Sequence, residues 1–292
     1  MVATNFETVI DGKQVKPVIL RNKNLQAVIC NYGARLVELQ YTDVNVIVTF
    51  PTLKDYFMPP VFYHGATIGR YGNRIKNGEF KLNGMVYTLP VNNGPNHLHG
   101  GPKGFHNQVW EYETVEEASA TLHYLSPDGE EGYPGDLDVR VTFALTDDDA
   151  LEISYKATAD FATPVNLTNH AYFNLNGGGT ALNHRLQINA DNFTPVDETL
   201  IPTGIQPVAG TALDFRSLKE IGKDINNDEE QIRIGGGYDH NFVLNKNGEN
   251  ELSFAAKAIG DQTGIVMEAF TTEPGVQLFS GNFPEEVLPN SY

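Results

Sequence analysis

The chain has 292 residues, of which 40% are hydrophobic and 20% charged, the composition of a folded globular protein rather than a disordered one. Its net charge of -17 argues against binding to nucleic acid or to an anionic membrane surface, because both need a basic face. Cys30 is the only cysteine, which excludes an intrachain disulfide and a cysteine-based zinc cluster. We recognise no signal peptide and no transmembrane run, so we expect a cytoplasmic protein.

In chain order, residues 52–56 are the first segment with a helical pattern, although it is short. Residues 80–89 predict a β-hairpin with Asn83-Gly84 as a type I′ turn. Residues 137–145 and 151–157 alternate apolar and polar side chains on either side of a polar turn, which predicts a second hairpin. Residues 216–221 suggest another short helix and residues 226–230 a polar surface loop. Residues 245–248 break two further apolar runs in the same way as the turns of the two hairpins.

Short strands separated by turn signals indicate a β-sandwich or barrel and not alternating strands and helices. No linker rich in proline or serine divides the chain, and no internal repeat is found. We therefore predict one all-β domain over residues 1–292 with few short helices, long enough to bury a substantial core.

The segment Asn96-His97-Leu98-His99-Gly100-Gly101 is the most informative motif, because it places two imidazoles beside a glycine pair. On a strand, His97 and His99 would face the same side, so a metal site with His170 or Asp239 as third ligand is one interpretation. A packed histidine beside a surface histidine is a second, and a metal-free acid/base site is a third. The residues alone leave all three open.

His170 lies among amide and aromatic side chains, a setting that suits sugar recognition, although a core histidine bonded to the backbone fits equally well. Histidine is also the side chain best suited to acid catalysis near neutral pH. Asp239 follows a glycine triplet and is either a ligand of substrate hydroxyls or a turn residue that bonds its own backbone. Arg70 and Arg74 share one glycine-containing segment, and spacing does not tell which of them is structural and which faces a cleft.

Two other classes of protein are disfavoured by missing motifs. Neither glycine triplet, at residues 177–179 and 235–237, matches a phosphate-binding loop or a dinucleotide fingerprint, which argues against nucleotide binding. The G-x-S-x-G motif of serine hydrolases is absent as well.

Taken together, these segments resemble the aldose 1-epimerases, also called galactose mutarotases. The similarity is carried by blocks in the family's order, at residues 65–75, 93–101, 104–110, 128–135, 167–175, 201–204, 237–241 and 271–277. Agreement over so many blocks is far more specific than any single motif. The resemblance implies a large antiparallel β-sandwich, free of metal and cofactor, with the sugar in a cleft on one sheet.

The resemblance also implies an isomerase that interconverts the α and β anomers of free aldoses such as galactose and glucose. A carboxylate base takes the proton of the C1 hydroxyl while a histidine protonates the ring oxygen, so that the ring opens and closes again. By position, His170 would be the acid and His99 would bond the same region of the sugar. The sugar hydroxyls would be held by Asn73, Arg74, Asp239 and Gln277.

The family's base is a glutamate downstream of the position that matches Gln277. The sequence ends at Tyr292 without such a segment, and Glu285 and Glu286 stand in a different context, so no base is assigned. We therefore expect a chain that lacks the family's C-terminal strands. The alternative is a non-catalytic carbohydrate-binding protein. An epimerase for phosphorylated hexoses would need a basic cluster that the motifs do not supply.

Overall fold

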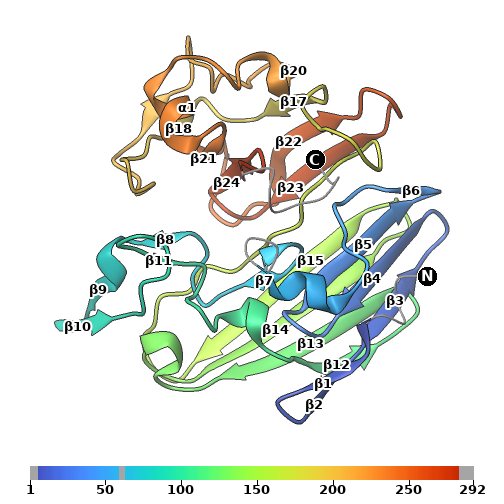
Figure 1. Cartoon of the computed structure of the whole chain (residues 1–292), viewed down its shortest axis with the longest axis vertical. Coiled ribbons are helices and arrows are strands. Elements are labelled where there is room, and N and C mark those ends of the chain that lie inside the picture. The colour runs from blue at the N-terminus through green and yellow to red at the C-terminus, as the bar shows by residue number, and fades with distance from the viewer. Residues whose placement is uncertain (1–5, 59–62, 283–292) are drawn as a thin grey trace. The chain divides into compact units, whose positions relative to one another are not determined.

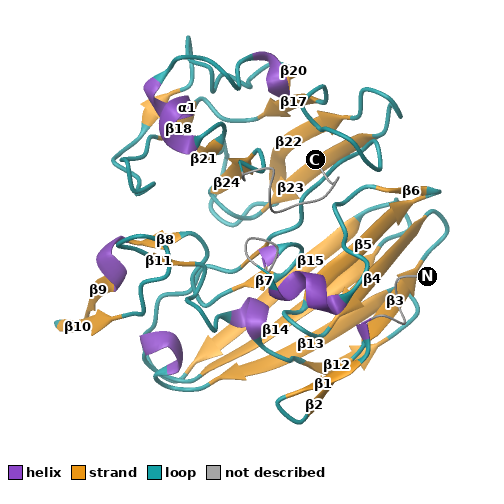
Figure 2. Ribbon diagram, in the orientation of Figure 1, coloured by secondary structure: helices purple, strands orange, loops and turns teal. Residues whose placement is uncertain are grey.

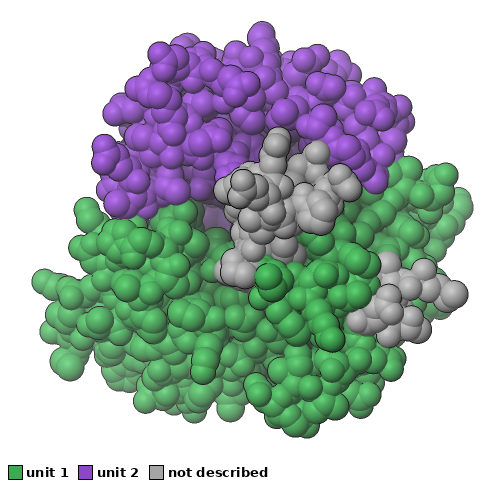
Figure 3. Space-filling model, viewed as in Figure 1, with its two compact units in different colours: residues 1–172 green, residues 173–292 purple. Residues whose placement is uncertain are grey.

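The computed structural model shown in Figure 1 describes residues 6–58 and 63–282. Strands joined by loops make up most of this part of the chain, and its helices are few and short (Figure 2). The prediction of an all-β protein is therefore confirmed. The chain divides into two compact units, Met1–Tyr172 and Phe173–Tyr292, which Figure 3 shows in different colours. A single domain over residues 1–292 stays a prediction, and each unit is described by itself.

Unit 1 contains two four-stranded antiparallel sheets. The first has the order β3 (Pro17–Arg21), β4 (Leu25–Cys30), β5 (Arg35–Tyr41) and β6 (Val44–Asn45), and the second has the order β12 (Glu111–Val115), β13 (Ser119–Ser126), β14 (Leu137–Leu145) and β15 (Leu151–Ala159). Four strand pairs complete the unit: β1 (Thr8–Ile10) with β2 (Lys13–Val15), β9 (Glu79–Leu82) with β10 (Met85–Thr88), β8 (Arg74–Ile75) with β11 (His97–Leu98), and β7 (Thr67–Ile68) with β16 (Thr168–Asn169).

Strand β14 shows why the period of two marks a strand that has one buried face. Its alternate residues Leu137, Val139, Val141, Phe143 and Leu145 are all buried, while the residues between them are partly exposed. Because successive side chains of a strand point to opposite faces, this pattern places one face of β14 in the core. Leu145 pairs with Leu151 across the turn, so the predicted hairpin is confirmed.

The other predicted hairpin also forms, as β9 and β10, in which Leu82 pairs with Met85. Asn83 and Gly84 have φ angles of 51° and 79°, the two positive values that a type I′ turn requires. The helical pattern at residues 52–56 is met by a 3₁₀ helix over Leu53–Phe57. In the described part of unit 1, further 3₁₀ helices cover Lys76–Gly78, Phe105–Asn107 and Glu130–Gly132.

Unit 2 holds two more antiparallel four-stranded sheets. One has the order β20 (Lys219–Glu220), β17 (Arg185–Ile188), β22 (Ser253–Ile259) and β23 (Val266–Thr271), and the other has the order β19 (Gln206–Pro207), β18 (Asn192–Thr194), β21 (Asp239–Val243) and β24 (Gly275–Phe279). A 3₁₀ helix covers Ile221–Lys223, and helix α1 covers Glu230–Gly235.

Two sequence predictions for unit 2 need correction. The break at residues 245–248 does not join a hairpin, because β21 before it and β22 after it belong to different sheets. Residues 216–221 are not a helix, since Lys219 and Glu220 pair with β17 as a strand. The polar segment 226–230 is a surface loop as predicted up to Glu229, and its last residue, Glu230, begins α1. Helix α1 has only six residues, too few for a period of 3.6 to be recognised.

Helix α1 ends at a glycine for a conformational reason. Gly236 has φ 64° and ψ 23°, the left-handed conformation that closes many helices and that glycine adopts without strain. The glycine triplet at residues 235–237 therefore ends this helix. None of the helices in the described part of the chain is long and apolar enough to cross a membrane.

Candidate active site

His97 is a buried structural residue. Its Nδ1 lies 2.7 Å from the Pro90 carbonyl, which can only accept, so Nδ1 carries the hydrogen. Its Nε2 lies 2.8 Å from the hydroxyl of Tyr133, which therefore donates to it. With both ring nitrogens bonded inside unit 1, His97 is the packed histidine of the pair. The expectation that His97 and His99 share one face of a strand is wrong, because β11 ends at Leu98 and His99 has a φ of 52°.

His99 is half-buried and is held by the backbone of Asn73. The Asn73 N–H donates to His99 Nδ1 at 2.9 Å, and the His99 N–H donates to the Asn73 carbonyl at 3.1 Å. Because a backbone N–H points at Nδ1, the neutral ring must carry its hydrogen on Nε2. The loop is tightly packed beyond this point: a Cβ on Gly100 would lie 1.8 Å from the Gly69 carbonyl oxygen. Gly100 therefore permits the close approach that orients His99.

His170 follows β16 and is fixed by hydrogen bonds on both sides of its backbone. Its N–H donates to the Ala66 carbonyl at 2.9 Å, and its carbonyl accepts from the Gly65 N–H at 2.9 Å. The His170 ring meets the His99 ring at a centroid distance of 5.1 Å and an interplanar angle of 86°. The fold thus brings together two imidazoles that are far apart in sequence, as predicted for residues of one site.

Both imidazoles are neutral at neutral pH. Burial, assisted by the Arg35 guanidinium, lowers the pKa of His170 to about 4. Burial likewise holds the pKa of His99 well below its ordinary value, assisted by His170 and Arg74. The charges that act on the two rings come from arginines and other histidines, and no carboxylate of residues 6–58 and 63–282 is among them. The pair is therefore suited to directional hydrogen bonding before any proton moves.

Asn73 and Arg74 belong to the same cluster as His99. The Arg74 guanidinium donates through Nε to Asn93 Oδ1 at 2.9 Å and through Nη1 to Asn73 Oδ1 at 3.2 Å. Both residues are partly exposed, and Arg74 lies on β8, which pairs with β11. Asn73, Arg74, His99 and His170 thus form one connected group in unit 1.

Arg70 is the structural arginine of its segment. It is 2% exposed, and its guanidinium donates to Ser126 Oγ at 2.8 Å and to the carbonyls of Ser126, Pro127 and Pro134 at 2.9 to 3.0 Å. These bonds engage all three of its nitrogens inside unit 1. The structure therefore answers the question that spacing left open: Arg70 supports the loops, and Arg74 is the arginine beside the imidazoles.

Asp239 and Gln277 meet on one face of a sheet in unit 2. Gln277 Nε2 donates to Asp239 Oδ1 at 2.7 Å. Asn241 pairs with Gln277 across β21 and β24, and alternation places Asp239, Asn241 and Gln277 on the same face. His240 and Phe242, between them, are buried on the other face. The two predicted sugar ligands of this unit therefore lie side by side on its polar face, and Asp239 is not an isolated turn residue.

The backbone that leads into Asp239 is fixed by three side chains. The Tyr238 N–H donates to Ser280 Oγ at 2.9 Å, and Asn282 Nδ2 donates to the Tyr238 carbonyl at 3.1 Å. The Asp239 N–H donates to His240 Nδ1 at 3.2 Å, and burial lowers the pKa of His240 to about 4, so this acceptor stays neutral. Hydrogen bonds within unit 2 therefore hold the backbone at the start of β21 in place.

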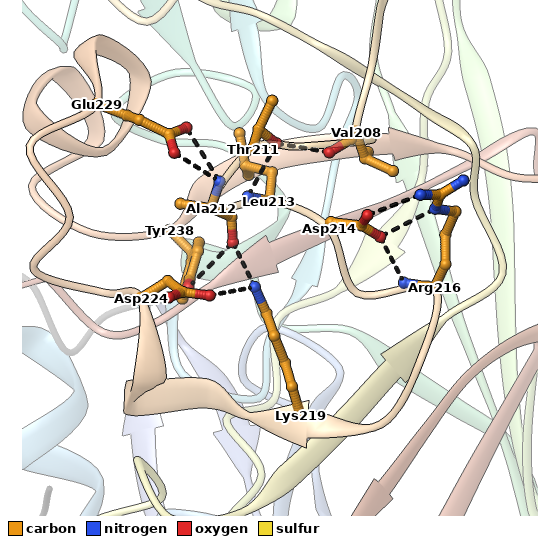
Figure 4. Close-up of polar contacts among 10 residues, drawn as sticks. All are labelled: Val208, Thr211, Ala212, Leu213, Asp214, Arg216, Lys219, Asp224, Glu229 and Tyr238. Carbon is orange, nitrogen blue, oxygen red and sulfur yellow. Dashed lines mark hydrogen bonds and ion pairs between the residues drawn. The ribbon is translucent and has the colours of Figure 1, made fainter.

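A second network supports the same strand from Ala212 (Figure 4). The Ala212 N–H donates to both carboxylate oxygens of Glu229, at 2.9 and 3.0 Å. Its carbonyl accepts from Lys219 Nζ at 2.7 Å and from the Tyr238 hydroxyl at 3.4 Å, while Lys219 also lies 2.8 Å from Asp224 Oδ2. These bonds tie Tyr238, the residue before β21, to the loop around Ala212.

The metal interpretation of the histidine motif finds no grouping that supports it. Among the residues that the structure describes, no three His, Cys, Asp or Glu side chains are gathered so that they could hold a metal ion. His97 uses both nitrogens in protein hydrogen bonds, and His99 uses Nδ1 in another. The acid/base interpretation is the one that these contacts favour.

The sequence singled out the aromatic side chains beside His170, which include Tyr172, but not Tyr63 or His106. Tyr63, His106 and Tyr172 each lie within 6 Å, centroid to centroid, of another ring of the cluster that contains His99 and His170. They come from three separated segments that follow no periodic pattern. The one local signal is Gly65, two residues after Tyr63, which marks a tight bend there.

Comparison with known proteins agrees with this fold. A family model described as aldose 1-epimerase matches residues 16–291. A galactose mutarotase from Sus scrofa is 43% identical over 277 residues, covering 92% of this chain and 78% of the relative. An aldose 1-epimerase from Escherichia coli is 37% identical over 280 residues, covering 94% and 80%.

Solved structures agree as well. A galactose 1-epimerase from Lactobacillus acidophilus superposes with a TM-score of 0.79 at 30% identity, covering 97% of this chain and 93% of that one. An aldose epimerase homologue from C. elegans gives 0.84 at 31% identity, covering 92% and 83%. Relatives named as enzymes do not favour the alternative of a non-catalytic carbohydrate-binding protein. The chain therefore belongs to the aldose 1-epimerase family, and the predicted isomerase with a galactose mutarotase-like β-sandwich fold is confirmed.

Proposed function

We propose that this protein interconverts the α and β anomers of free hexoses such as galactose and glucose, without metal or cofactor. The observation that carries the proposal is the perpendicular pair of neutral imidazoles, His99 and His170, beside the amide and guanidinium of Asn73 and Arg74. Several directional polar groups next to aromatic faces are what a neutral sugar needs for recognition. The names of the relatives, galactose mutarotase and aldose 1-epimerase, support the same substrate class.

In the proposed reaction, the protonated form of His170 donates a proton to the ring oxygen while the C1–O5 bond breaks, and the pKa of about 4 makes that form a stronger acid than an ordinary imidazolium. A base removes the proton of the C1 hydroxyl, whose electrons form the aldehyde carbonyl. Rotation about C1–C2 and attack of the O5 hydroxyl on the other face of the aldehyde give the second anomer, with both protons returned. His99, with its hydrogen on Nε2, bonds the same region of the sugar and orients it.

The sugar hydroxyls are proposed to be held by Asn73, Arg74, Asp239 and Gln277. Arginine and carboxylate side chains form strong hydrogen bonds to such groups. In the free protein these residues bond one another, Arg74 to Asn73 and Gln277 to Asp239. A sugar would exchange these bonds for its own, so little polar surface is left unpaired in either state.

The proposal does not name the base. Glu285 and Glu286, the carboxylates near the end of the sequence, lie outside the described residues. A general base typically raises the rate of such a reaction about 10²- to 10⁴-fold, so its titration should be visible in the pH dependence of turnover. We also propose a cytoplasmic location, which the single, free Cys30 supports because such a compartment keeps thiols reduced.

Polarimetry of freshly dissolved α-D-galactose tests this function directly. Faster decay to the equilibrium rotation in the presence of the protein is the expected result. A rate equal to that of buffer, with the protein folded by circular dichroism, would refute the proposal. Titration of the protein with sugar in the same buffer would then tell whether a binding protein remains.

A further inference from the structure

Tyr63 lies at the centre of the imidazole cluster. Its ring is 4.8 Å from His99, 4.7 Å from His106 and 5.8 Å from His170, measured between ring centroids. The His99 and His106 rings meet it at steep angles of 77° and 63°, whereas His170 stacks on it at 23°. One phenol ring thus touches both imidazoles of the candidate active site and a third imidazole as well.

The backbone holds Tyr63 in this place. The Tyr63 carbonyl accepts from the Ala66 N–H at 3.0 Å, which closes a tight turn, and the Gly65 N–H within the turn donates to the His170 carbonyl. Gly65 has a φ of 67°, and a Cβ there would lie 2.0 Å from the Leu36 carbonyl oxygen. The turn is therefore fixed by a glycine with no room for a side chain, and it links Tyr63 to His170 through the backbone.

His99 and His170 differ in how their ring planes are set. The Nδ1 of His99 accepts a backbone hydrogen bond, which orients that ring independently of its packing. The His170 ring is packed by aromatic contacts, with Tyr63 stacked on it and Tyr172 tilted at 35°, in addition to an interaction with its own backbone. Stacked and edge-on arrangements of aromatic rings are the preferred geometries of such contacts. Loss of the Tyr63 ring would therefore free His170 far more than His99.

We propose that Tyr63 is a positioning residue for the anomer interconversion: its ring holds His170 perpendicular to His99 and keeps water from the stacked face of His170. This inference rests on the proposed function and adds a residue that the sugar itself need not touch. Tyr63 acts through His170, so its removal should alter turnover more than substrate binding. The ring and not the hydroxyl carries the role, since the contacts with all three histidines are ring contacts.

The electrostatic surroundings of His170 give a readout that is independent of turnover. The titratable groups around its ring are Arg35, His99, His106, Tyr63 and Tyr172. Burial is the main cause of its low pKa, and the Tyr63 ring covers one face of the imidazole by stacking on it. Without that ring water reaches the imidazole, so the pKa of His170 rises from about 4 toward its ordinary value near 6.5.

The test compares Tyr63→Leu with the conservative Tyr63→Phe. Tyr63→Leu should lower kcat about 10- to 100-fold, the effect of a catalytic group displaced by an ångström, while KM changes less than about threefold. In the same variant the His170 ring, followed by NMR through its Cε1 proton, should titrate at a higher pH. Tyr63→Phe keeps the ring and should stay close to the wild type in kcat, KM and the His170 titration. If Tyr63→Leu does not fold, Tyr63→Met replaces it.

Tyr112→Phe is the matched control for a buried tyrosine of unit 1. It removes a hydroxyl that donates to the Ile29 and Lys16 carbonyls, at 2.9 and 3.0 Å. It should lower the stability of the fold without moving the pKa of His170 or kcat.

Two results would overturn the inference: wild-type kcat and His170 titration in Tyr63→Leu, or equal damage in Tyr63→Phe and Tyr63→Leu. If the wild type does not accelerate mutarotation, the proposed function fails instead. The His170 titration still decides whether Tyr63 shields the imidazole.

Discussion

The two groups of predicted site residues are built on different principles. In unit 1, His99 and His170 are neutral rings packed among other rings, and backbone hydrogen bonds hold them. In unit 2, Asp239 and Gln277 are polar side chains on one face of a sheet, bonded to each other. Packing fixes a group that must transfer a proton within narrow limits of geometry. A side chain that binds sugar hydroxyls needs only a hydrogen-bond partner in the free protein that the sugar can replace. We therefore propose that the imidazoles of unit 1 carry the chemistry and that Asp239 and Gln277 of unit 2 bind hydroxyls.

The largest effect is expected from His170→Ala, which removes the proposed acid. We predict a fall in kcat of about 10²–10⁴ with KM changed only slightly, because general acid catalysis acts in the transition state. Polarimetry gives the turnover, and circular dichroism verifies that the variant folds. Wild-type turnover by folded His170→Ala would remove unit 1 from its catalytic role.

Asp239→Ala should show the opposite pattern. Loss of a charged acceptor typically costs about 1.5–3 kcal/mol, so we predict KM to rise about 10- to 100-fold while kcat falls much less. The initial rate as a function of galactose concentration separates the two parameters. If kcat falls as far as in His170→Ala, the division between chemistry and recognition is wrong.

The stability of the fold should depend on pH through its buried histidines. Burial lowers the pKa of His240 to about 4 and that of His106 to about 3, whereas an unfolded histidine titrates near 6.5. Between these values the unfolded chain binds more protons, so the free energy of unfolding is highest above about pH 6.5. As the pH falls toward 4, the free energy of unfolding decreases by up to about 1.4 kcal/mol per pH unit for each of these histidines.

Urea denaturation at a series of pH values measures this loss of stability. His240→Asn keeps an acceptor for the Asp239 N–H and removes the titrating group. The slope of the free energy of unfolding against pH should therefore decrease by the equivalent of up to one proton. An unchanged slope in His240→Asn would show that His240 is not the neutral buried group described above.

The smallest effect is expected from Gln277→Ala. A neutral hydrogen bond contributes about 0.5–1.5 kcal/mol, which corresponds to a rise of roughly 2- to 10-fold in KM. Gln187→Ala serves as the control in the same unit, since the amide of Gln187, on β17, donates to the Arg216 carbonyl and not to the Asp239 face. Equal KM values for the two variants would argue against a substrate contact at Gln277.

The sequence predicted the parts of the fold that follow from long alternating patterns or from characteristic turn residues. Alternation over residues 137–157 and the Asn83-Gly84 turn are strong local signals, and both hairpins form. The pairs β7–β16 and β8–β11 contain two residues per strand, too few for any period to show. Yet these pairs place His170 and Arg74 in the cluster. The segments that build the site are thus the ones whose pairing depends on the whole fold.

The same limit applies to the site residues. Asn73, Arg74, His99 and His170 were named from their similarity to a family, and their mutual contacts in unit 1 support that choice. Spacing alone misjudged the H-x-H motif, because a left-handed residue ends the strand at His99. Tyr63 carried no signal, since a lone tyrosine beside a glycine bend is common in loops. Its role follows only from the three rings around it.

The most direct test of the central claim is a double-mutant cycle in polarimetry with His99→Ala, His170→Ala and the double variant. If the two imidazoles act as one unit on the ring oxygen, the double variant should lose at most about tenfold more activity than His170→Ala alone, because groups that act together are far from additive. Additive losses, with each single variant costing the same factor in either background, would contradict the claim that His99 and His170 form one catalytic pair.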